Sequence, residues 1–209
     1  MPQGIKELDE LDFDYSYFVY GLVKQLKPKV VFEVGLGDNA YTGASVAQAL
    51  EENSRQRYTW YNQETHTPIE GKYFVIEIDP TTTAMERLER FPKKYWEVIV
   101  GNSENPDLYN LDTEFYADIV LVDGDHSEER AYGDTKIVME SNILNPDDGL
   151  IVFHDTYMSC SERGTGPVAK AMKRIEKDFN LEIFQVSKRQ SFSIGRPKNQ
   201  ICHPKLDFY

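Results

Sequence analysis

Residues 117–126 read ADIVLVDGDH, and residues 150–155 read LIVFHD. In each stretch an apolar run of strand length stops at Asp and His residues, a pattern typical of a buried strand followed by a polar turn. In an open parallel sheet, the residues just past the carboxyl ends of neighbouring strands meet in one crevice, where such folds bind ligands. The two stretches therefore predict a parallel sheet with Asp and His side chains gathered at one edge.

Acidic turns of this kind have two interpretations. Asp caps helix N-termini and His fills polar gaps, so a single turn can be purely structural. Clustered Asp and His side chains also bind metal ions or move protons. Because two matched turns follow strands that we expect to be neighbours, we favour a functional site.

Strands and helices alternate over most of the chain. A strand begins at residue 30 and opens into a glycine-containing loop at residue 35, and further strands are predicted at 72–78, 95–100, 117–122 and 150–153. Helices are predicted at 43–52, at 81–91 and within 127–144, and this alternation indicates five parallel strands. After a helix at 167–179, two short strands at 181–186 and 191–194 are close enough for an antiparallel pair. The predicted fold class is α/β, a Rossmann-like three-layer sandwich with a seven-stranded sheet.

We expect one domain over residues 1–209, made of an N-terminal helical segment (1–28), the core (30–196) and an irregular tail (197–209). The N-terminal helix is predicted from about residue 5 to residue 26. Its aromatic residues are interpreted as packing on the sheet, with a tyrosine bordering a ligand crevice as the alternative. Residues 53–71 are polar and too long for an ordinary connection, so they fit a lid or binding loop of unassigned conformation.

Composition narrows the class of partner. The formal net charge of −12 opposes attraction to nucleic acid or to anionic membrane surfaces, because both require a basic face. The two cysteines do not indicate a disulfide framework. The first residues lack the pattern of a signal peptide, and no apolar run approaches the roughly 20 residues that span a bilayer. We expect a cytoplasmic protein that acts on a small molecule, with a homo-oligomer left open.

The loop after the first strand has features of a nucleoside site. Glycines at 35 and 37 let the backbone approach a ligand closely, and Glu77 at the tip of the second strand can bind both hydroxyls of a ribose. The loop does not match the G-x-G-x-x-G pattern of dinucleotide sites. Glu33 and Asp38 flank the glycines, and their carboxylates would repel a pyrophosphate but attract an ammonium group. An amino-acid-bearing nucleoside therefore fits better than a dinucleotide.

Five stretches together resemble a known family. In chain order they are VFEVGLGDNAYTGASVAQAL, YFVIEIDP, IVGNSEN, ADIVLVDGDH and GLIVFHDTY. They resemble class I S-adenosylmethionine-dependent methyltransferases, in particular the small-molecule O-methyltransferase branch with a DGDH-type motif. This branch includes antibiotic-sugar and catechol-type metal-dependent enzymes. The similarity extends from about residue 30 to residue 196.

The resemblance implies a set of cofactor contacts. Glu77 would hold the ribose, Asn102 and Ser103 would border the adenine, and the first loop would line the methionine part. Residues 38–42 look like an insertion relative to the family pattern. The implied cofactor-binding residues are Glu33, Gly35, Gly37, Asp38, Glu77, Asn102, Ser103 and Asp123.

The resemblance also implies a metal site and a general base. Asp123, His154 and Asp155 would bind a divalent cation, magnesium or manganese, although the family has an acidic residue where this chain has His154. His126, three residues after Asp123, would accept the proton of the acceptor hydroxyl. Asp134, on the following helix, is interpreted as a solvent-facing or capping residue.

The leading hypothesis is therefore S-adenosylmethionine-dependent O-methylation of a small-molecule or sugar hydroxyl, assisted by a divalent metal. One alternative is a metal-dependent hydroxylase-like enzyme of the same fold group, which would require oxygen and iron. The other is a non-catalytic protein that binds a nucleoside or serves as an assembly surface. A crevice between Gly37 and His154 that is plugged by side chains would favour this last alternative.

Overall fold

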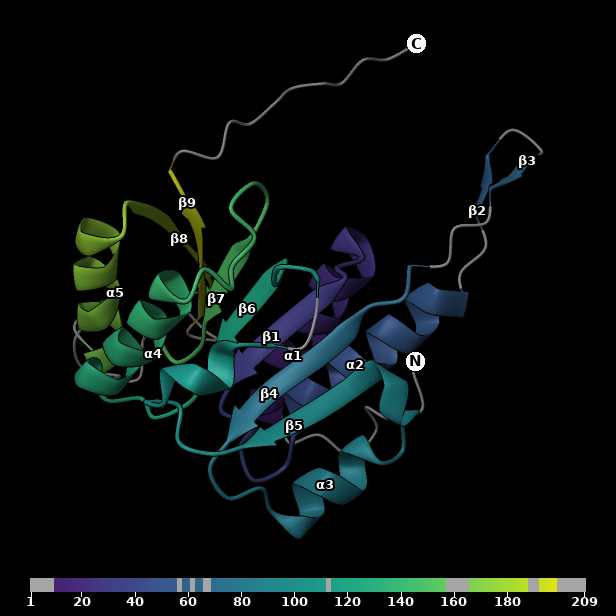
Figure 1. Ribbon diagram of the computed structural model, residues 1–209, viewed down its shortest axis with the longest axis horizontal. Helices are drawn as coiled ribbons and strands as arrows, with labels where there is room; N and C mark the ends of the chain where they lie inside the picture. Colours follow the sequence, from purple (N-terminus) through teal and green to yellow (C-terminus); the bar gives the residue numbers. More distant parts are fainter. Residues whose placement is uncertain are drawn as a thin grey trace.

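The computed structural model describes residues 10–55, 58–60, 63–65, 69–111, 114–156, 166–187 and 192–198. Its main sheet has five parallel strands, which are β1 (Val30–Val34), β4 (Lys72–Glu77), β5 (Trp96–Val100), β6 (Ile119–Val122) and β7 (Leu150–Phe153). The antiparallel strands β8 (Leu181–Ser187) and β9 (Phe192–Pro197) complete one edge. The strand order is β5-β4-β1-β6-β7-β9-β8 (Figure 1). The predicted seven-stranded sheet with an antiparallel edge pair is confirmed.

Helices cover both faces of this sheet (Figure 1). The helices α1 (Glu10–Leu26), α2 (Tyr41–Arg55) and α3 (Thr82–Leu88) pack on one face, and α4 (Glu128–Glu140) and α5 (Pro167–Asp178) pack on the other. The three predicted layers are therefore present. Among the helices in these described ranges, none is both long enough and apolar enough to cross a membrane.

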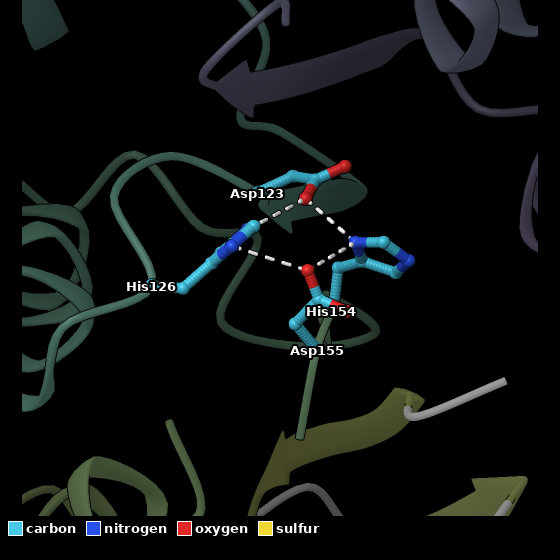
Figure 2. Close-up of side chains that lie close together, drawn as sticks. All are labelled: Asp123, His126, His154 and Asp155. Atoms are coloured by element: carbon cyan, nitrogen blue, oxygen red, sulfur yellow. Dashed lines mark hydrogen bonds and ion pairs between the residues drawn. The ribbon is translucent and has the colours of Figure 1, made fainter. Parts of the chain in front are cut away.

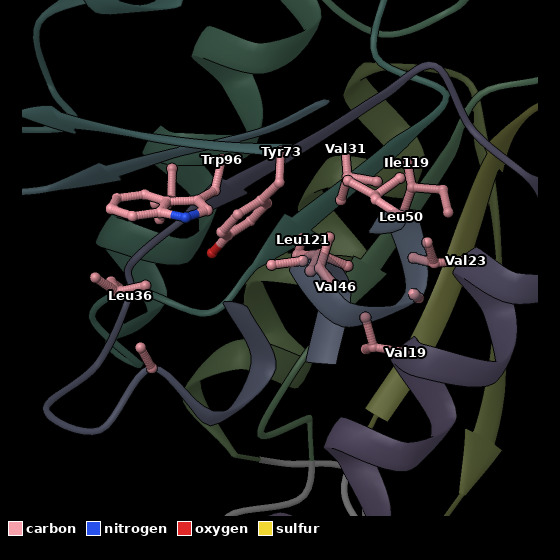
Figure 3. Packing of buried hydrophobic residues seen from close by; sticks show 14 of the residues in the cluster. Val19, Val23, Val31, Leu36, Val46, Leu50, Tyr73, Trp96, Ile119 and Leu121 are labelled. Carbon is pink, nitrogen blue, oxygen red and sulfur yellow. The ribbon is translucent and has the colours of Figure 1, made fainter. Parts of the chain in front are cut away.

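Strand alternation divides the core into two clusters. Val31 of β1 faces the layer of α1 and α2, whereas its neighbour Phe32 faces α4 and α5, because successive side chains of a strand point to opposite faces. Figure 3 shows the first cluster, in which Val19 of α1 and Val46 of α2 lie against the sheet. Complete burial of such side chains contributes roughly 1.5–3 kcal/mol each, and it fixes the strand ends that carry the polar residues.

Two helices begin beside the polar turns, and both have side-chain caps. Thr81 accepts a hydrogen bond from the backbone of Ala84 at the start of α3, and Ser127 accepts one from Arg130 at the start of α4. Capping by Ser or Thr satisfies backbone donors that a helix cannot satisfy itself. The Ser127 cap fixes the chain directly after the DGDH turn.

The largest departure from the sequence-based prediction lies in residues 53–71. The helix α2 continues to Arg55, and strands β2 (Tyr58–Trp60) and β3 (Gln63–Thr65) form a separate antiparallel pair. An ion pair between Glu51 and Arg55, spaced four residues apart, supports the longer helix. Two short 3₁₀ helices, η1 (Lys93–Tyr95) and η2 (Pro106–Tyr109), were also not predicted. The predicted start of the first helix, at 5–9, and the tail from 199 onward lie outside the described residues.

Candidate functional site

A crevice of about 310 Å³ opens at the carboxyl ends of β1, β4, β5 and β6. We call it the strand-end crevice. It contains the predicted glycine loop, the tip of β4 and the turns after β5 and β6, as expected for a ligand site in a parallel sheet. Its lining residues are Val34, Gly35, Gly37, Ile76, Glu77, Ile78, Gly101, Asn102, Ser103, Asp123, Gly124, Asp125, Arg130 and Asp134.

The two glycines of the loop have different roles. Both have positive φ angles, 89° at Gly35 and 66° at Gly37. A Cβ atom at Gly35 would lie 2.5 Å from the backbone oxygen of Asp123 and 2.6 Å from the Cα of Gly124, so Gly35 lets the ends of β1 and β6 touch. A Cβ atom at Gly37 would meet nothing within 4 Å. Because Gly37 has no side chain, a ligand in the crevice can approach the backbone closely at this position.

Glu77 is held by the loop that it faces. Its carboxylate accepts hydrogen bonds from the backbone amides of Leu36 at 2.9 Å, Ile78 at 2.8 Å and Asp79 at 3.3 Å. The bond from Leu36 joins the tip of β4 to the glycine loop, and the three bonds together fix the direction of the side chain. Because two carboxylate oxygens offer about four acceptor positions, Glu77 retains capacity for a ligand hydroxyl.

The far end of the crevice carries a buried acid. Asp134 of α4 is only 3% exposed and lines the crevice with Asn102 and Ser103. Burial raises the pKa of its carboxyl, and a hydrogen bond from the Ser103 side chain partly offsets this effect. The prediction that Asp134 faces solvent or caps a helix is therefore wrong. The side chain lies one helical turn after Arg130, on the face of α4 that is turned toward the crevice.

A second cavity, of about 370 Å³, adjoins the first and is lined by four side chains that could hold a metal ion. We call it the cluster cavity. Asp123 follows β6, His126 lies in the same turn, and His154 and Asp155 follow β7. One ligand atom from each lies within 4.8 Å of the others. Figure 2 shows the two carboxylates and two imidazoles alternating around a common centre. The structure thus brings together the predicted metal ligands and the predicted base.

The contacts within this cluster are close. His154 Nδ1 lies 2.8 Å from Asp123 Oδ1 and 3.4 Å from Asp155 Oδ2. His126 Nδ1 lies 3.1 Å from Asp155 Oδ2, and its Nε2 lies 3.4 Å from Asp123 Oδ1. Asp155 has a φ of 52°, an uncommon left-handed conformation that Asp tolerates better than most residues. This bend directs His154 and Asp155, although adjacent in sequence, to the same point.

The cluster shifts the acidity of its members. Burial by itself raises the pKa of the Asp123 carboxyl, but hydrogen bonds to His126 and His154 outweigh it and the pKa is lowered. The hydrogen bond to Asp123 raises the pKa of the His126 imidazole; burial opposes this, and the Asp155 carboxylate adds to it. Asp123 is therefore ionised at neutral pH and is available to a cation.

Six of the eight predicted cofactor-binding residues line the strand-end crevice, and Glu33 and Asp38 do not. Glu33 is 1% exposed and accepts a hydrogen bond from the Tyr73 hydroxyl beneath α2. Its position follows from strand alternation, since it lies on the same face of β1 as Val31. Asp38 lines the cluster cavity instead. Gly37, Asp123 and Gly124 line both cavities and join them.

Arg130 and Tyr15 are among the lining residues that were not assigned to the site from the sequence. Arg130 of α4 lines the crevice and forms an ion pair with Glu104 at 2.5 Å. Arg130 lies in the first turn of the helix that Ser127 caps, directly after the DGDH turn, and this position could have indicated that it lies near the crevice. Tyr15 of α1 lines the cluster cavity and stacks on His154, with ring centroids 4.1 Å apart. Such a contact was predicted from the sequence only as an alternative, in which a tyrosine of the first helix borders a ligand crevice.

Comparison with known proteins gives consistent findings. The pattern that defines a family described as a methyltransferase domain matches residues 34–156. A comparison with curated protein sequences finds no match. The fold is similar to that of the methyltransferase PaMTH1 of Podospora anserina, solved with S-adenosylhomocysteine, at 14% identity. The TM-score is 0.68 over 95% of this chain and 89% of that one.

Two further solved structures share the fold. The O-methyltransferase TomG of Streptomyces achromogenes, involved in tomaymycin synthesis and solved with S-adenosylmethionine, is 13% identical, with a TM-score of 0.63 over 93% of this chain and 89% of that one. An O-methyltransferase from Bacillus cereus, solved with S-adenosylhomocysteine, is 11% identical, with a TM-score of 0.59 over 90% and 81% of the two chains. At these identities the likeness concerns the fold.

Proposed function

This chain belongs to the family of methyltransferase domains, and from that premise we propose that it moves a methyl group from S-adenosylmethionine to a hydroxyl oxygen of a small molecule, such as a sugar or glycoside. We further propose that a divalent cation held by the cluster assists the reaction. The observation that carries the proposal is the joining of the two cavities at Gly37, Asp123 and Gly124. A nucleoside in one cavity would have its reactive end directed toward the other.

The strand-end crevice fits a cationic nucleoside. Its volume of about 310 Å³ lies within the usual range for small-molecule sites, and Glu77 offers acceptors for a ribose. Its charged lining residues are Glu77, Asp123, Asp125, Asp134 and Arg130, an excess of carboxylates that opposes a pyrophosphate. S-adenosylmethionine carries a sulfonium and an ammonium group, which this field favours. Asp38, which follows Gly37 and lines the cluster cavity, is the candidate partner for the ammonium.

The cluster fits a divalent cation. Asp123, His154 and Asp155 would supply two carboxylate oxygens and one imidazole nitrogen, a donor set suited to manganese, iron or zinc as well as magnesium. A cation bound there would act as a Lewis acid that lowers the pKa of an acceptor hydroxyl. Tyr15, stacked on His154, would fix the orientation of this imidazole.

The chain's own residues supply positioning and a base. The acceptor oxygen must lie in line with the bond between the methyl carbon and the sulfonium sulfur, so holding both reactants in adjoining cavities provides much of the rate. As the new carbon–oxygen bond forms and the carbon–sulfur bond breaks, the hydroxyl proton passes to His126. Its side chain is 37% exposed, against 16% for His154, so it is the imidazole more accessible to an acceptor. Asp123 and Asp155 would stabilise the imidazolium that results.

The alternatives fare less well. A non-catalytic role predicted a plugged crevice between Gly37 and His154, whereas a cavity of about 370 Å³ lies between these residues. A hydroxylase-like reaction would require iron and molecular oxygen, so methyl transfer that proceeds equally well without oxygen would argue against it. Membership of the methyltransferase family already weighs in favour of methyl transfer.

Calorimetry with two ligands tests the proposal. S-adenosylhomocysteine should bind the wild-type protein with and without EDTA, because the strand-end crevice requires no cation. Manganese should bind the wild type and Asp147→Asn, an exposed control before β7, but should bind Asp155→Asn at least tenfold more weakly. Failure of the wild type to bind S-adenosylhomocysteine would refute the cofactor assignment. Equal manganese affinity in the two variants would refute the metal site.

The transfer itself is tested with S-adenosylmethionine labelled in the methyl group and a panel of hydroxyl-bearing sugars, glycosides and phenols. We expect labelled product that is stable to mild base, as an ether is and an ester is not. Label transferred only to amines or thiols would contradict the proposed acceptor class.

A further inference from the structure

A tyrosine of the first helix has an unusual place in the cluster cavity. Tyr15 of α1 is 2% exposed and lines this cavity together with His126, His154 and Asp155. Its hydroxyl has no hydrogen-bond partner among the residues that the structure describes. Buried hydroxyls nearly always have partners, because leaving one unpaired costs free energy on folding. A buried, unpaired hydroxyl on a residue that lines a cavity is therefore a candidate ligand contact.

Packing fixes the position of this hydroxyl. The Tyr15 ring stacks on His154, with centroids 4.1 Å apart and an interplanar angle of 27°. The ring centroid of Phe192 on β9 lies 5.7 Å from that of Tyr15 and 4.4 Å from that of Phe18. Phe18 is one helical turn further along α1. These neighbours hold the ring in a fixed place in the cavity lining, with its hydroxyl buried.

This hydroxyl can act as a hydrogen-bond donor. A phenol carries its proton at neutral pH and can both donate and accept hydrogen bonds. The nearby carboxylates already have other partners: Asp123 contacts His154, and Glu33 accepts from the Tyr73 hydroxyl. The proton of Tyr15 is thus free for an oxygen that enters the cavity.

We propose that Tyr15 is an acceptor-binding residue, whose hydroxyl donates a hydrogen bond to a hydroxyl oxygen of the small molecule bound in the cluster cavity. This inference rests on the proposed function and extends it, since it names a contact with the acceptor. The ring of Tyr15 also holds His154 in its orientation. The N-terminal helix α1 would then form one wall of the acceptor site and take part in acceptor choice.

Three variants separate the hydroxyl from the ring. Tyr15→Phe removes only the hydroxyl and keeps the stacking, whereas Tyr15→Leu removes both. Tyr20→Phe is the matched control, since it deletes a hydroxyl of the same helix that bonds to Glu52 outside the cavity. The probe is catechol, which carries two adjacent hydroxyls and is small enough for a cavity of about 370 Å³. Its binding is measured by calorimetry on protein saturated with S-adenosylhomocysteine, with manganese and with EDTA.

We expect Tyr15→Phe to bind catechol about three- to tenfold more weakly than wild type, the range for one lost hydrogen bond. Its affinities for S-adenosylhomocysteine and manganese should stay within about twofold of wild type. Tyr20→Phe should leave catechol binding unchanged. Tyr15→Leu should also weaken manganese binding, because His154 loses its stacking partner; unchanged manganese affinity would overturn the role of the ring.

Thermal denaturation gives a readout that needs no ligand. Because the hydroxyl is unpaired in the described structure, Tyr15→Phe should melt at or above the wild-type temperature. A fall of several degrees would mean that the hydroxyl is already satisfied within the protein, and it would overturn the proposal. So would equal catechol affinity in Tyr15→Phe and wild type, or no catechol binding by wild type in either condition. Absent binding of S-adenosylhomocysteine would instead count against the proposed function.

Discussion

The strand-end crevice and the cluster cavity adjoin, yet they are built by different means. The crevice is mostly backbone, in that Gly35 lets two strand ends touch and Glu77 is held by three backbone amides, one from the glycine loop and two from the turn after β4. The cluster cavity is made of side chains from segments far apart in sequence, with Tyr15 of α1 stacked on His154 after β7. A site built from backbone should lose binding when a substitution changes the chain geometry. In a site built from side chains, each substitution should remove only the function of the group that it deletes.

The largest effect should come from the glycine loop. Gly35→Val places a side chain where even a Cβ would lie 2.5 Å from the Asp123 backbone, so the ends of β1 and β6 must separate. We expect loss of detectable S-adenosylhomocysteine binding and a fall of about 2–4 kcal/mol in the free energy of unfolding. Calorimetry and urea denaturation measure the two quantities.

Gly37→Val is the informative partner of that variant. Its Cβ enters open space, so unfolding should be affected by only about 1 kcal/mol, from the positive φ. Cofactor binding should still be lost, because Gly37 lines the crevice and an added side chain would occupy space that the ligand needs. If Gly35→Val were as stable as Gly37→Val, the close approach of the strand ends would have no structural importance.

The next largest effect should come from His126 in the cluster cavity. We expect His126→Ala to lower the rate of methyl transfer by about 10²- to 10⁴-fold, the range for loss of a general base. Cofactor affinity should remain near that of wild type, because His126 lines the cluster cavity and not the crevice. The measurement is single-turnover transfer of a labelled methyl group to an acceptor found in the screen.

Manganese affinity decides between two roles for His126. As a base, it should be removable with little effect on manganese binding. A loss of tenfold or more would make it a fourth ligand, in keeping with the four donor atoms that lie within 4.8 Å of one another. Activity that survives both chelation and His126→Ala would refute the metal-assisted mechanism.

Part of the crevice could be predicted from the sequence for a physical reason. Glycines with positive φ and acids at strand tips are local requirements, so Gly35, Gly37 and Glu77 could be assigned from short motifs. Glu33 was expected beside the cofactor, yet it bonds to Tyr73 on the face of the sheet that α1 and α2 cover. Its two-residue spacing from apolar Val31 could have indicated that face.

The remaining differences concern tertiary packing. Asp134 was interpreted as exposed, because its burial depends on how α4 lies over the crevice and not on its neighbours in sequence. The β2–β3 pair has few apolar residues, so its alternation was weak and it was not predicted. The centre of the sheet was predictable, because strands such as β1 and β6 are mostly apolar runs that are buried on both faces.

A smaller effect is expected at Glu77. Glu77→Ala removes the acceptor for ribose hydroxyls and the anchor of three backbone amides, so affinity for S-adenosylhomocysteine should fall by roughly ten- to a hundredfold. Glu77→Gln keeps one acceptor oxygen and should lose less. The control is Glu70→Gln. Glu70 lies just before β4, and its exposed carboxylate pairs with Lys94, so this variant should bind S-adenosylhomocysteine as wild type does. Wild-type affinity in Glu77→Ala would exclude this residue from the site.

The smallest effect concerns the cost of keeping Asp134 in the crevice. Burial raises the pKa of this carboxyl above its value in the unfolded chain, so the folded state holds the proton more tightly. The folded state is therefore penalised once pH rises above the unfolded pKa, and the full penalty applies above the folded pKa. Asp134→Asn mimics the protonated form and should stabilise the ligand-free protein at pH 7.5 by about 1 kcal/mol, or roughly 2–4 °C in melting temperature.

That gain should shrink as pH is lowered toward 4, where the carboxyl of the wild type becomes protonated in both states. Thermal denaturation of the two proteins across this range measures it. The same substitution should weaken binding of S-adenosylhomocysteine, since Asp134 lines the crevice with Asn102 and Ser103. Opposite signs for stability and affinity would mean that the crevice retains a buried charge for its ligand. Reduced stability at pH 7.5 would mean instead that the carboxylate serves the fold, and the crevice would then owe its shape to a side chain as much as to its backbone.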